Sequence, residues 1–337
     1  MQRVLITGGC GFIGHHFVEH FLKNTDWEIV VLDRLNYASL GFDRLRDIKA
    51  FDDKRVLVLT ADFTKPITDG LKKEIGNVDY IVHLGAETHV DNSIKDPEPF
   101  VMSNVVGTMR MLELARSLDI KWFNFFSTDE VMGPAPEGVF YKEWDRYNSA
   151  NPYAATKAGA EELCLAYANT YKVPLFITHT MNCFGERQHP EKFIPMTIKK
   201  VLDGETVFIH SDPTKTKSGS RFYIHCRNVA SAVHFLLEKA QQRDKYNIVG
   251  EKEMTNLEVA QFIADVIGKP LKYEMIDFHS SRPGHDLRYA LDGSKMESMG
   301  WELPKNFEES LEKTIKWYLN NPKWLCQQED QQNTYQK

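Results

Sequence analysis

Short apolar runs alternate with helical stretches along the first half of the chain. Val4–Thr7 has the pattern of a buried strand and leads into a glycine-rich turn over Gly8–Gly14. The periodicity then predicts a helix over Phe12–Leu22 and a second apolar strand over Glu28–Leu32, which ends at Asp33. Strand, turn, helix and strand in this order predict one βαβ unit.

The same alternation continues as far as Thr180. We expect further strands at Val56–Leu59, Tyr80–Leu84, Trp122–Ser127 and Leu175–Thr180, and helices at Asn104–Leu118 and Ala155–Tyr171. Strands that alternate with helices in this way favour a parallel sheet covered on both faces. The sequence therefore predicts the α/β class, with a doubly wound parallel sheet of the Rossmann type in a first domain over residues 1–180.

The pattern becomes less regular after this point. Loops rich in Pro, Gly and Lys lie at Gly185–Pro195 and Ser211–Ser220, and helices are predicted at Asn228–Lys239 and Asn256–Ile267. We expect residues 181–325 to form a smaller, C-terminal α/β domain, with residues 221–240 returning to the first domain. The Gln-rich tail at 326–337 has little apolar content, which predicts disorder.

Composition narrows the function classes. The 337 residues are 42% hydrophobic and 26% charged, which is ordinary for a globular protein. The formal net charge of -6 and the lack of a basic stripe argue against a nucleic-acid binder, because affinity for the phosphate backbone comes from clustered Lys and Arg. No apolar segment approaches membrane-spanning length and no basic leader precedes the first strand, so we expect no membrane partner and a cytoplasmic location.

The cysteines are scattered. Cys10, Cys164, Cys183, Cys226 and Cys326 lack the paired spacing of a zinc site or of a disulfide framework. We therefore expect free thiols in a reducing compartment and no metal site.

Glycines at positions 8, 11 and 14 directly follow a strand and open a helix. Glycine lets the backbone turn sharply and approach a pyrophosphate, while the helix N-terminus attracts its charge. Asp33, at the end of the second strand, can accept hydrogen bonds from a ribose and would repel an extra phosphate, so NAD is favoured over NADP, although the neighbouring Arg34 could accept that phosphate. We expect cofactor contacts from Gly8, Gly11, Phe12, Ile13, Gly14, Asp33, Asp62, Leu84 and Ala86, with Asp62 either at the adenine edge or a solvated loop residue.

Tyr153 and Lys157 are four residues apart and so share one face of a predicted helix. There an ammonium can lower the pKa of the phenol and bind the nicotinamide ribose, while Tyr153 takes a hydroxyl proton as hydride leaves the carbon. Such a pair often occurs by chance. The glycine turn upstream and Ser127-Thr128 at a strand end favour a catalytic pair.

Asp129 and Glu130 follow the apolar run Trp122–Phe126, at the carboxyl end of a central strand, where doubly wound folds place their ligand crevice. They could simply be acidic residues in the first turn of a helix. Beside a Tyr/Lys pair they fit a chemical need, because oxidation of a hexose C4 hydroxyl acidifies the C5 hydrogen. Glu130 as base and Asp129 as acid could then remove water across C5 and C6, and crowded carboxylates resist simultaneous ionisation.

At this point the residues resemble a known family. The matching segments are Thr7–Gly14, His83–Asp91, Ser127–Val131, the Tyr153/Lys157 pair, Pro190–Pro195 and Arg282–Ala290. They resemble the nucleotide-sugar 4,6-dehydratases of the extended short-chain dehydrogenase/reductase group, with the dTDP-glucose enzymes as the most similar type. The adjacent Asp129 and Glu130 are the specific part, since epimerases and decarboxylases of the same fold usually have other residues there.

The resemblance implies roles for four residues near the substrate. Thr128 would help polarise the C4 oxygen, Asn182 and Arg221 would hold the nucleotide diphosphate, and Lys192 would lie in the nucleotide pocket. Asn182 could instead cap a turn and Lys192 could be a solvated loop charge. For Arg221 a fork of donors suits a diphosphate. The resemblance also implies a homodimer through two helices per subunit, for which the helices predicted at Asn104–Leu118 and Ala155–Tyr171 are the candidates.

Three departures from the family pattern lie near the sugar or the nucleotide. Met132 stands where the dTDP-glucose enzymes usually have Tyr, Cys183–Glu186 replaces an Asn-Tyr-Gly-Pro pattern, and Asp212–Ser220 is longer than usual. The base and the sugar substituents therefore stay open among dTDP-, UDP-, GDP- and CDP-linked glucose or N-acetylglucosamine. A 4-epimerase or 5,6-dehydratase of the same fold, and a non-catalytic NAD(H)-binding sensor or scaffold, are the competing hypotheses.

Overall fold

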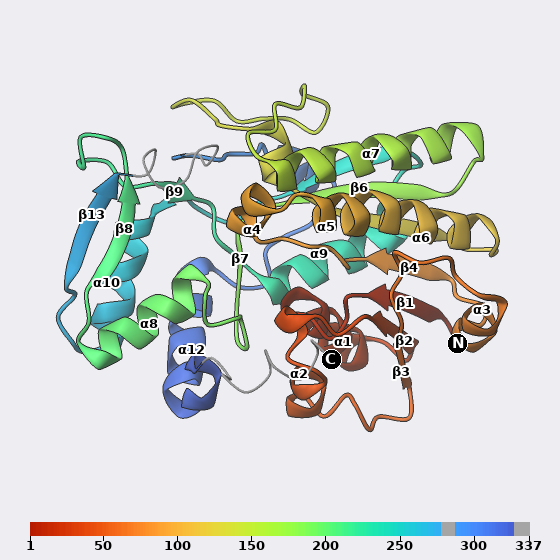
Figure 1. The fold of residues 1–337 in the computed structure, drawn as a ribbon, viewed down its shortest axis with the longest axis horizontal. Helices are drawn as coiled ribbons and strands as arrows, with labels where there is room; N and C mark the ends of the chain where they lie inside the picture. The colour runs from red at the N-terminus through yellow and green to blue at the C-terminus, as the bar shows by residue number, and fades with distance from the viewer. Residues whose placement is uncertain (278–286, 327–337) are drawn as a thin grey trace.

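The computed structural model describes residues 1–277 and 287–326, and its largest element is a parallel sheet (Figure 1). Seven strands within these residues form it, in the order β11-β6-β5-β4-β1-β2-β3. Their bounds are β1 (Arg3–Thr7), β2 (Glu28–Asp33), β3 (Val56–Thr60), β4 (Tyr80–His83), β5 (Trp122–Thr128), β6 (Leu175–Thr180) and β11 (Asp244–Ile248). Each pair of neighbours is parallel, so the predicted α/β doubly wound fold is confirmed.

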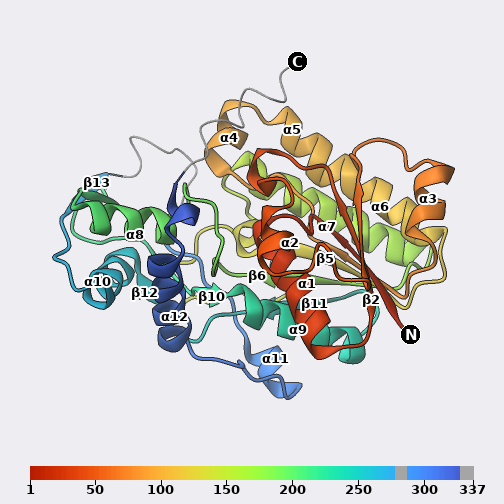
Figure 2. The same ribbon diagram turned by 90° about the horizontal axis from the view of Figure 1, so that it is seen from below.

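Two cores form because alternate side chains of a strand point to opposite faces of the sheet. On β1, Val4 and Ile6 join the core beneath α1 (Phe12–Asn24) and α9 (Cys226–Lys239), and both side chains are fully buried. Leu5 points the other way, into the core that α6 (Gly107–Arg116) and α7 (Pro152–Thr170) cover. Figure 2 shows α1 and α9 side by side on their face of the sheet.

The remaining elements around the sheet are short. They are α2 (Asp43–Asp47), α3 (Asp69–Ile75), α4 (Val90–Lys95), α5 (Glu98–Phe100), α11 (Ser294–Ser298), a π-helical stretch (Val101–Val106) that runs into α6, and 3-10 turns at Tyr37–Ser39 (η1) and Asp129–Met132 (η3), while the 3-10 turn η4 (Pro322–Leu325) packs on α8 and α12 away from the sheet. The helix predicted over Asn104–Leu118 therefore begins as a π-helix and ends at Arg116.

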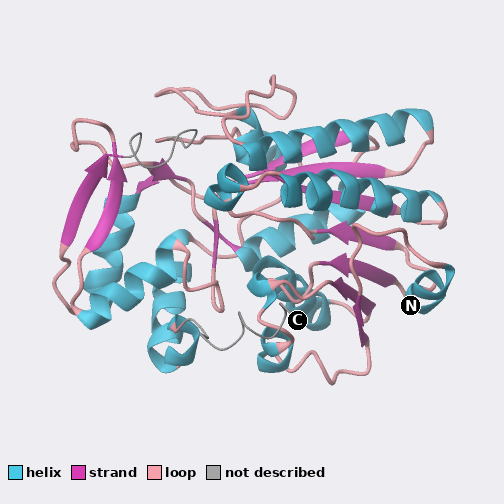
Figure 3. Cartoon of the chain, viewed as in Figure 1, coloured by secondary structure: helices cyan, strands magenta, loops and turns pink. Residues whose placement is uncertain are grey.

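A second group of elements lies at one end of the sheet (Figure 3). It contains α8 (Phe193–Asp203), α10 (Asn256–Ile267), α12 (Phe307–Asn320) and the parallel pair β8 (Val207–Ser211) and β13 (Tyr273–Asp277), with the short pairs β7 (Cys183–Phe184) with β10 (Ile224–His225) and β9 (Ser220–Arg221) with β12 (Met254–Thr255). Phe184, Ile198, Ile263 and Leu311 pack together in its core. Within the described residues no helix combines the length and apolarity that a bilayer crossing requires.

The order of the strands fixes where a ligand can bind. Chain connections run outward from β1 on one side, through β2 and β3, and outward from β4 on the other. The loops after β1 and β4 consequently diverge and leave a crevice at the carboxyl ends of these strands. Thr7 joins the two strand ends, since its Oγ1 accepts a hydrogen bond from the N–H of Gly85 at 3.0 Å.

Candidate active site

The glycine turn after β1 has no room for side chains. Gly8 has φ +70°, and a Cβ there would lie 2.9 Å from the Cα of Gly85. A Cβ on Gly14 would lie 2.1 Å from the carbonyl oxygen of Gly8. Gly11 precedes α1 and has no side chain to cap the helix, which leaves the first amides of α1 for a ligand. This cradle suits the pyrophosphate of a dinucleotide, as predicted.

Asp33 closes the adenosine end of the crevice. Its side chain is buried, and its carboxylate accepts hydrogen bonds from the N–H groups of Cys10 (3.0 Å) and Leu35 (2.8 Å) and from Ser39 Oγ (3.1 Å). These donors fix the carboxylate beside the glycine turn, where it disfavours a further phosphate. Arg34, which could have accepted that phosphate, forms an ion pair with Glu87. The arrangement fits NAD.

Two cavities that share a wall occupy the crevice. The one at the glycine turn has a volume of about 170 Å³, and eight of the predicted cofactor residues line it: Gly8, Gly11, Phe12, Ile13, Gly14, Asp33, Leu84 and Ala86. Asp62 does not line it. Its carboxylate instead accepts the N–H of Thr64 at 2.9 Å, and the neighbouring Phe63 contributes to the wall. Of the two interpretations of Asp62, the solvated loop residue therefore fits better than a contact with adenine.

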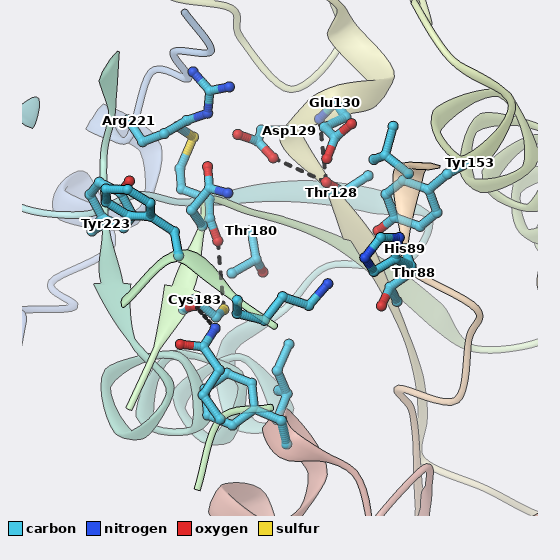
Figure 4. Close-up of a pocket in the computed structure, with 18 of the residues that line it drawn as sticks. Thr88, His89, Thr128, Asp129, Glu130, Tyr153, Thr180, Cys183, Arg221 and Tyr223 are labelled. Carbon is cyan, nitrogen blue, oxygen red and sulfur yellow. Dashed lines mark hydrogen bonds between the residues drawn. The ribbon is translucent and has the colours of Figure 1, made fainter. Parts of the chain in front are cut away.

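The second cavity, of about 380 Å³, holds the predicted reaction site. Its lining includes Thr128, Asp129, Glu130, Tyr153, Lys157, Asn182, Lys192 and Arg221, which come from elements far apart in the sequence. Figure 4 shows Asp129 and Glu130 between Arg221 on one side and Tyr153 on the other. The structure thus brings together every catalytic and substrate residue that the sequence predicted.

The two acidic residues begin the 3-10 turn η3 directly after β5. Thr128 caps this turn, because its Oγ1 accepts the N–H of Glu130 at 3.4 Å, and the same hydroxyl donates to Asp129 Oδ1 at 3.0 Å. The helix-start interpretation of these residues is therefore correct as a description of the backbone. It does not exclude catalysis, since both side chains line the cavity.

Burial sets the charge state of Asp129. Its side chain is 4% exposed, and its Oδ2 has no hydrogen-bond partner among the described residues. Burial raises the pKa of Asp129 to about 6, against the opposing charge of Arg221. The sequence argument attributed a protonated carboxyl to crowding by Glu130, whereas in the structure desolvation is the main cause.

Tyr153 and Lys157 stand on the first turns of α7, and both side chains are buried. Burial and the nearby Glu130 carboxylate raise the pKa of Tyr153 above its usual range, and the Thr128 hydroxyl acts in the opposite direction. Burial lowers the pKa of Lys157 to about 8. The expected lowering of the phenol pKa by Lys157 is not seen, since the Lys157 ammonium donates to the carbonyl of Phe126 at 2.5 Å.

Backbone and ring contacts hold the guanidinium of Arg221 in place. Its guanidinium donates to the carbonyl of Leu287 at 2.8 Å and lies 4.7 Å from the ring centroid of Tyr289. Lys192 lines both cavities and Asn182 lines the reaction cavity, so both stand where a bound nucleotide could reach them.

Sequence reasoning missed part of the lining. Thr88, His89, Thr180, Cys183, His210, Tyr223 and Asn256 also face the reaction cavity. His89 lies in the matched segment His83–Asp91, and Cys183 lies in a segment that departs from the family pattern near the sugar or the nucleotide. Their sequence neighbours could therefore have indicated both residues. Tyr223 and Asn256 had none, because only the folding of the second group of elements against the sheet brings them to the cavity. Of the matched segment Arg282–Ala290, residues 282–286 lie outside the described residues.

Comparison with known proteins decides the family. The sequence profile of the NAD dependent epimerase/dehydratase family matches residues 4–249. This chain belongs to that family. The family is NAD-dependent, in agreement with the cradle at the glycine turn and with Asp33, and NAD is the cofactor of this protein.

Within the epimerase/dehydratase family, similarity extends over nearly the whole chain. The low-salt glycan biosynthesis protein Agl12 of Haloferax volcanii is 39% identical over 94% of this chain and 99% of its own length. The crystal structure of DesIV, a dTDP-glucose 4,6-dehydratase of Streptomyces venezuelae solved with NAD bound, superposes with a TM-score of 0.86 at 34% identity, covering 96% of this chain and 98% of the other. The UDP-glucose 4-epimerase of Thermus thermophilus, also with NAD, gives 0.83 at 27% identity over 94% and 99%.

Proposed function

We propose that this protein is a nucleotide-sugar 4,6-dehydratase, which converts a nucleotide-diphospho-hexose into its 4-keto-6-deoxy derivative. The observation that carries the proposal is the presence of Asp129 and Glu130 in the same cavity as Tyr153 and Lys157. Oxidation at C4 alone needs the Tyr/Lys pair. Loss of water from the oxidised sugar needs in addition a base and an acid, and this cavity supplies two carboxyl groups.

When bound, NAD would supply reversible acceptance of a hydride, the one that C4 loses and C6 gains. The Tyr153 phenol is the group that receives the C4 hydroxyl proton, and Thr128, whose hydroxyl lies beside it, orients the C4 oxygen. In the structure the Lys157 ammonium donates to the carbonyl of Phe126. We propose that a bound substrate draws the ammonium away from this carbonyl. Its positive charge would then favour the deprotonated form of the Tyr153 phenol.

Glu130 and Asp129 divide the elimination between them. The ketone at C4 acidifies the hydrogen on C5, and Glu130 removes that proton. When hydride returns to C6, the protonated Glu130 gives a proton back to C5, so the net loss is one water. Asp129 gives a proton to the departing C6 hydroxyl, which leaves as water. A raised pKa suits this role, because a carboxyl that is half protonated near pH 6 can both hold and donate a proton close to neutrality.

Arg221, Lys192 and Asn182 are proposed to hold the diphosphate and the nucleotide. A guanidinium offers a fork of donors to a diphosphate, and both cations line the reaction cavity. The similar dehydratase acts on dTDP-glucose, but the residues of this cavity leave open dTDP-, UDP-, GDP- or CDP-linked glucose and N-acetylglucosamine.

A panel of these nucleotide hexoses, read by mass spectrometry, tests the proposal. The substrate turned over fastest should lose the mass of one water, with no net reduction of NAD. An isomer of unchanged mass would instead show a 4-epimerase, the activity that the name of the similar Thermus thermophilus protein gives. A product that lost water but kept the hydroxyl at C4 would indicate a 5,6-dehydratase, and binding without any product would indicate a sensor.

Glu130→Gln tests the role of the base. The variant should oxidise C4 but not eliminate water, so reduced nicotinamide should accumulate on the enzyme in single-turnover absorbance measurements. Glu137→Gln is the matched control, since Glu137 is exposed and does not line either cavity. Formation of the 4-keto-6-deoxy product by Glu130→Gln at the wild-type rate would contradict the assigned role.

We also propose the larger organisation expected from the sequence. Residues 1–180 together with 221–240 would form the NAD-binding domain and residues 181–325 the nucleotide-sugar-binding domain, since α9 packs on α1. A homodimer through the α6 and α7 regions and a cytoplasmic location stay predictions.

A further inference from the structure

Asn151 occupies the position before α7, the helix that carries Tyr153 and Lys157. Pro152 follows it at the first helical position, where a missing N–H costs no hydrogen bond. Asn151 caps the helix, because its Oδ1 accepts the N–H of Ala154 at 2.9 Å. The capping role alone would be served about equally well by Ser or Asp.

The other half of the Asn151 amide makes a second contact. Its Nδ2 donates to Glu130 Oε2 at 2.9 Å, and the Asn151 residue is only 5% exposed. The orientation of the amide is fixed by its surroundings, because the N–H of Ala154 requires an acceptor and so places the amide oxygen on that side. The NH2 group must therefore face Glu130. Ser or Thr at this position would keep the cap but could not span to the carboxylate.

The intervening loop holds the two residues in register. The N–H of Asn148 donates to the carbonyl of Val131 at 2.9 Å, which ties the end of the loop to η3. Gly133 has φ +75°, and a Cβ there would lie 2.2 Å from the carbonyl oxygen of Asn148. This close approach brings the start of α7 back to Glu130, so the contact of Asn151 with Glu130 follows from the local fold.

We propose that Asn151 is a positioning residue that aims the Glu130 carboxylate at the sugar, and that it couples the eliminating base to the helix of the oxidising pair. The inference rests on the proposed dehydratase function. The NH2 group of Asn151 can only donate hydrogen bonds, so its contact with Glu130 requires an acceptor, as a carboxylate oxygen is. The contact also restricts rotation of the Glu130 carboxylate about its terminal χ3 bond, which otherwise rotates easily. A base held in one orientation reaches the transition state with less reorganisation.

Asn151→Ser separates positioning from capping. It should leave the thermal midpoint and the KM for the nucleotide sugar close to those of the wild type, and it should leave C4 oxidation intact. Elimination should slow by about ten- to a hundredfold, the scale expected when a reacting group is misplaced. Reduced nicotinamide should then accumulate during turnover, as in Glu130→Gln. Asn306→Ser is the matched control, because Asn306 caps α12 by the same contact, to the N–H of Glu309 at 2.8 Å, away from the site.

Asn151→Asp provides a second measurement. It keeps the acceptor for Ala154 and nearly the same shape, but it sets a second carboxyl group against Glu130. The elimination rate should recover as the pH is lowered, because the new carboxyl can donate to Glu130 once it is protonated. A residue that only capped the helix would show no such pH profile.

The outcomes distinguish the two proposals. If the wild type removes water and Asn151→Ser does so at the same rate without accumulation of reduced nicotinamide, the positioning role is wrong and the dehydratase function stands. If the wild type leaves the substrate mass unchanged, the function is wrong and the positioning role falls with it. A slower Asn151→Ser whose oxidation step is slowed equally would also overturn the positioning role.

Discussion

Asp129→Asn should change how stability depends on pH. The wild-type carboxyl is buried and has a raised pKa, so folding costs free energy once the group must ionise inside the protein. Asparagine has nearly the same shape and cannot ionise. Its Oδ1 can still accept the hydroxyl of Thr128, which donates to Asp129 Oδ1 at 3.0 Å.

The size of the effect follows from the pKa shift. A rise from 3.8 to about 6 corresponds to roughly 3 kcal/mol between the two protonation states. The folded state binds more protons than the unfolded state between these two pKa values, so wild-type stability falls as the pH rises through this window and levels off above it. The free energy of unfolding of the variant, relative to the wild type, should therefore rise by about 1.4 kcal/mol from about pH 5 to about pH 8.

Urea denaturation of both proteins across this pH range, at one fixed NAD concentration, measures the difference. Contributions that do not depend on pH, including any cost of burying the new NH2 group, shift the whole curve and leave its slope unchanged. Asp119→Asn is the control, since Asp119 is exposed. A stability difference for Asp129→Asn that is flat from pH 5 to pH 8 would refute the assignment of a desolvated carboxyl, and with it the reason for choosing Asp129 as the acid.

Three further predictions test other parts of the site. Gly14→Ala should abolish NAD binding in titration calorimetry or prevent folding, because its Cβ would lie 2.1 Å from a carbonyl oxygen. The control Gly70→Ala in α3 should bind NAD normally, and equal NAD affinities of the two variants would contradict the role of the glycine turn in binding the pyrophosphate. Tyr153→Phe should lower turnover by about a hundredfold or more while leaving NAD affinity within a few fold, and a near-normal rate would remove Tyr153 from the proton path. Met102 lies just before α6, in the proposed dimer interface, and its side chain is 37% exposed. Met102→Asp would place a charge there and should convert a dimer to a monomer in light scattering, whereas a wild-type protein that is already monomeric would contradict the proposed dimer.

Much of the sheet was predictable from local pattern. Val4–Thr7 and Leu175–Thr180 each begin with three consecutive apolar residues, and the structure contains both as strands, with β1 beginning one residue earlier at Arg3. β11 was missed, because Asp244, Lys245 and Asn247 interrupt its apolar pattern. Lys245 is nevertheless buried, since it is paired with Glu161 at 3.4 Å. Only a fold that supplies such a partner makes a strand of this composition stable.

Two helices that pack away from the sheet were likewise not predicted from the local sequence pattern. α8 begins at Phe193 inside the segment that the sequence suggested as a loop, since Pro195 and the preceding charges hid its start. α12 was also missed. Its buried residues include Leu311 and Ile315, and its core partners come from distant parts of the chain. A pattern in one segment cannot reveal a partner that is remote in sequence.

The sequence by itself determined the local chemistry of this protein: a glycine turn between a strand and a helix, an acidic residue at the next strand end, and a Tyr/Lys pair on one helical face. These depend on short spacings that the backbone translates directly into geometry. Only the tertiary structure decided which surroundings set the pKa of Asp129 and which side chain orients Glu130. The burial that raises the pKa of Asp129 and the contact of Asn151 with Glu130 arise from packing between separate elements, and packing is a property of the folded chain as a whole.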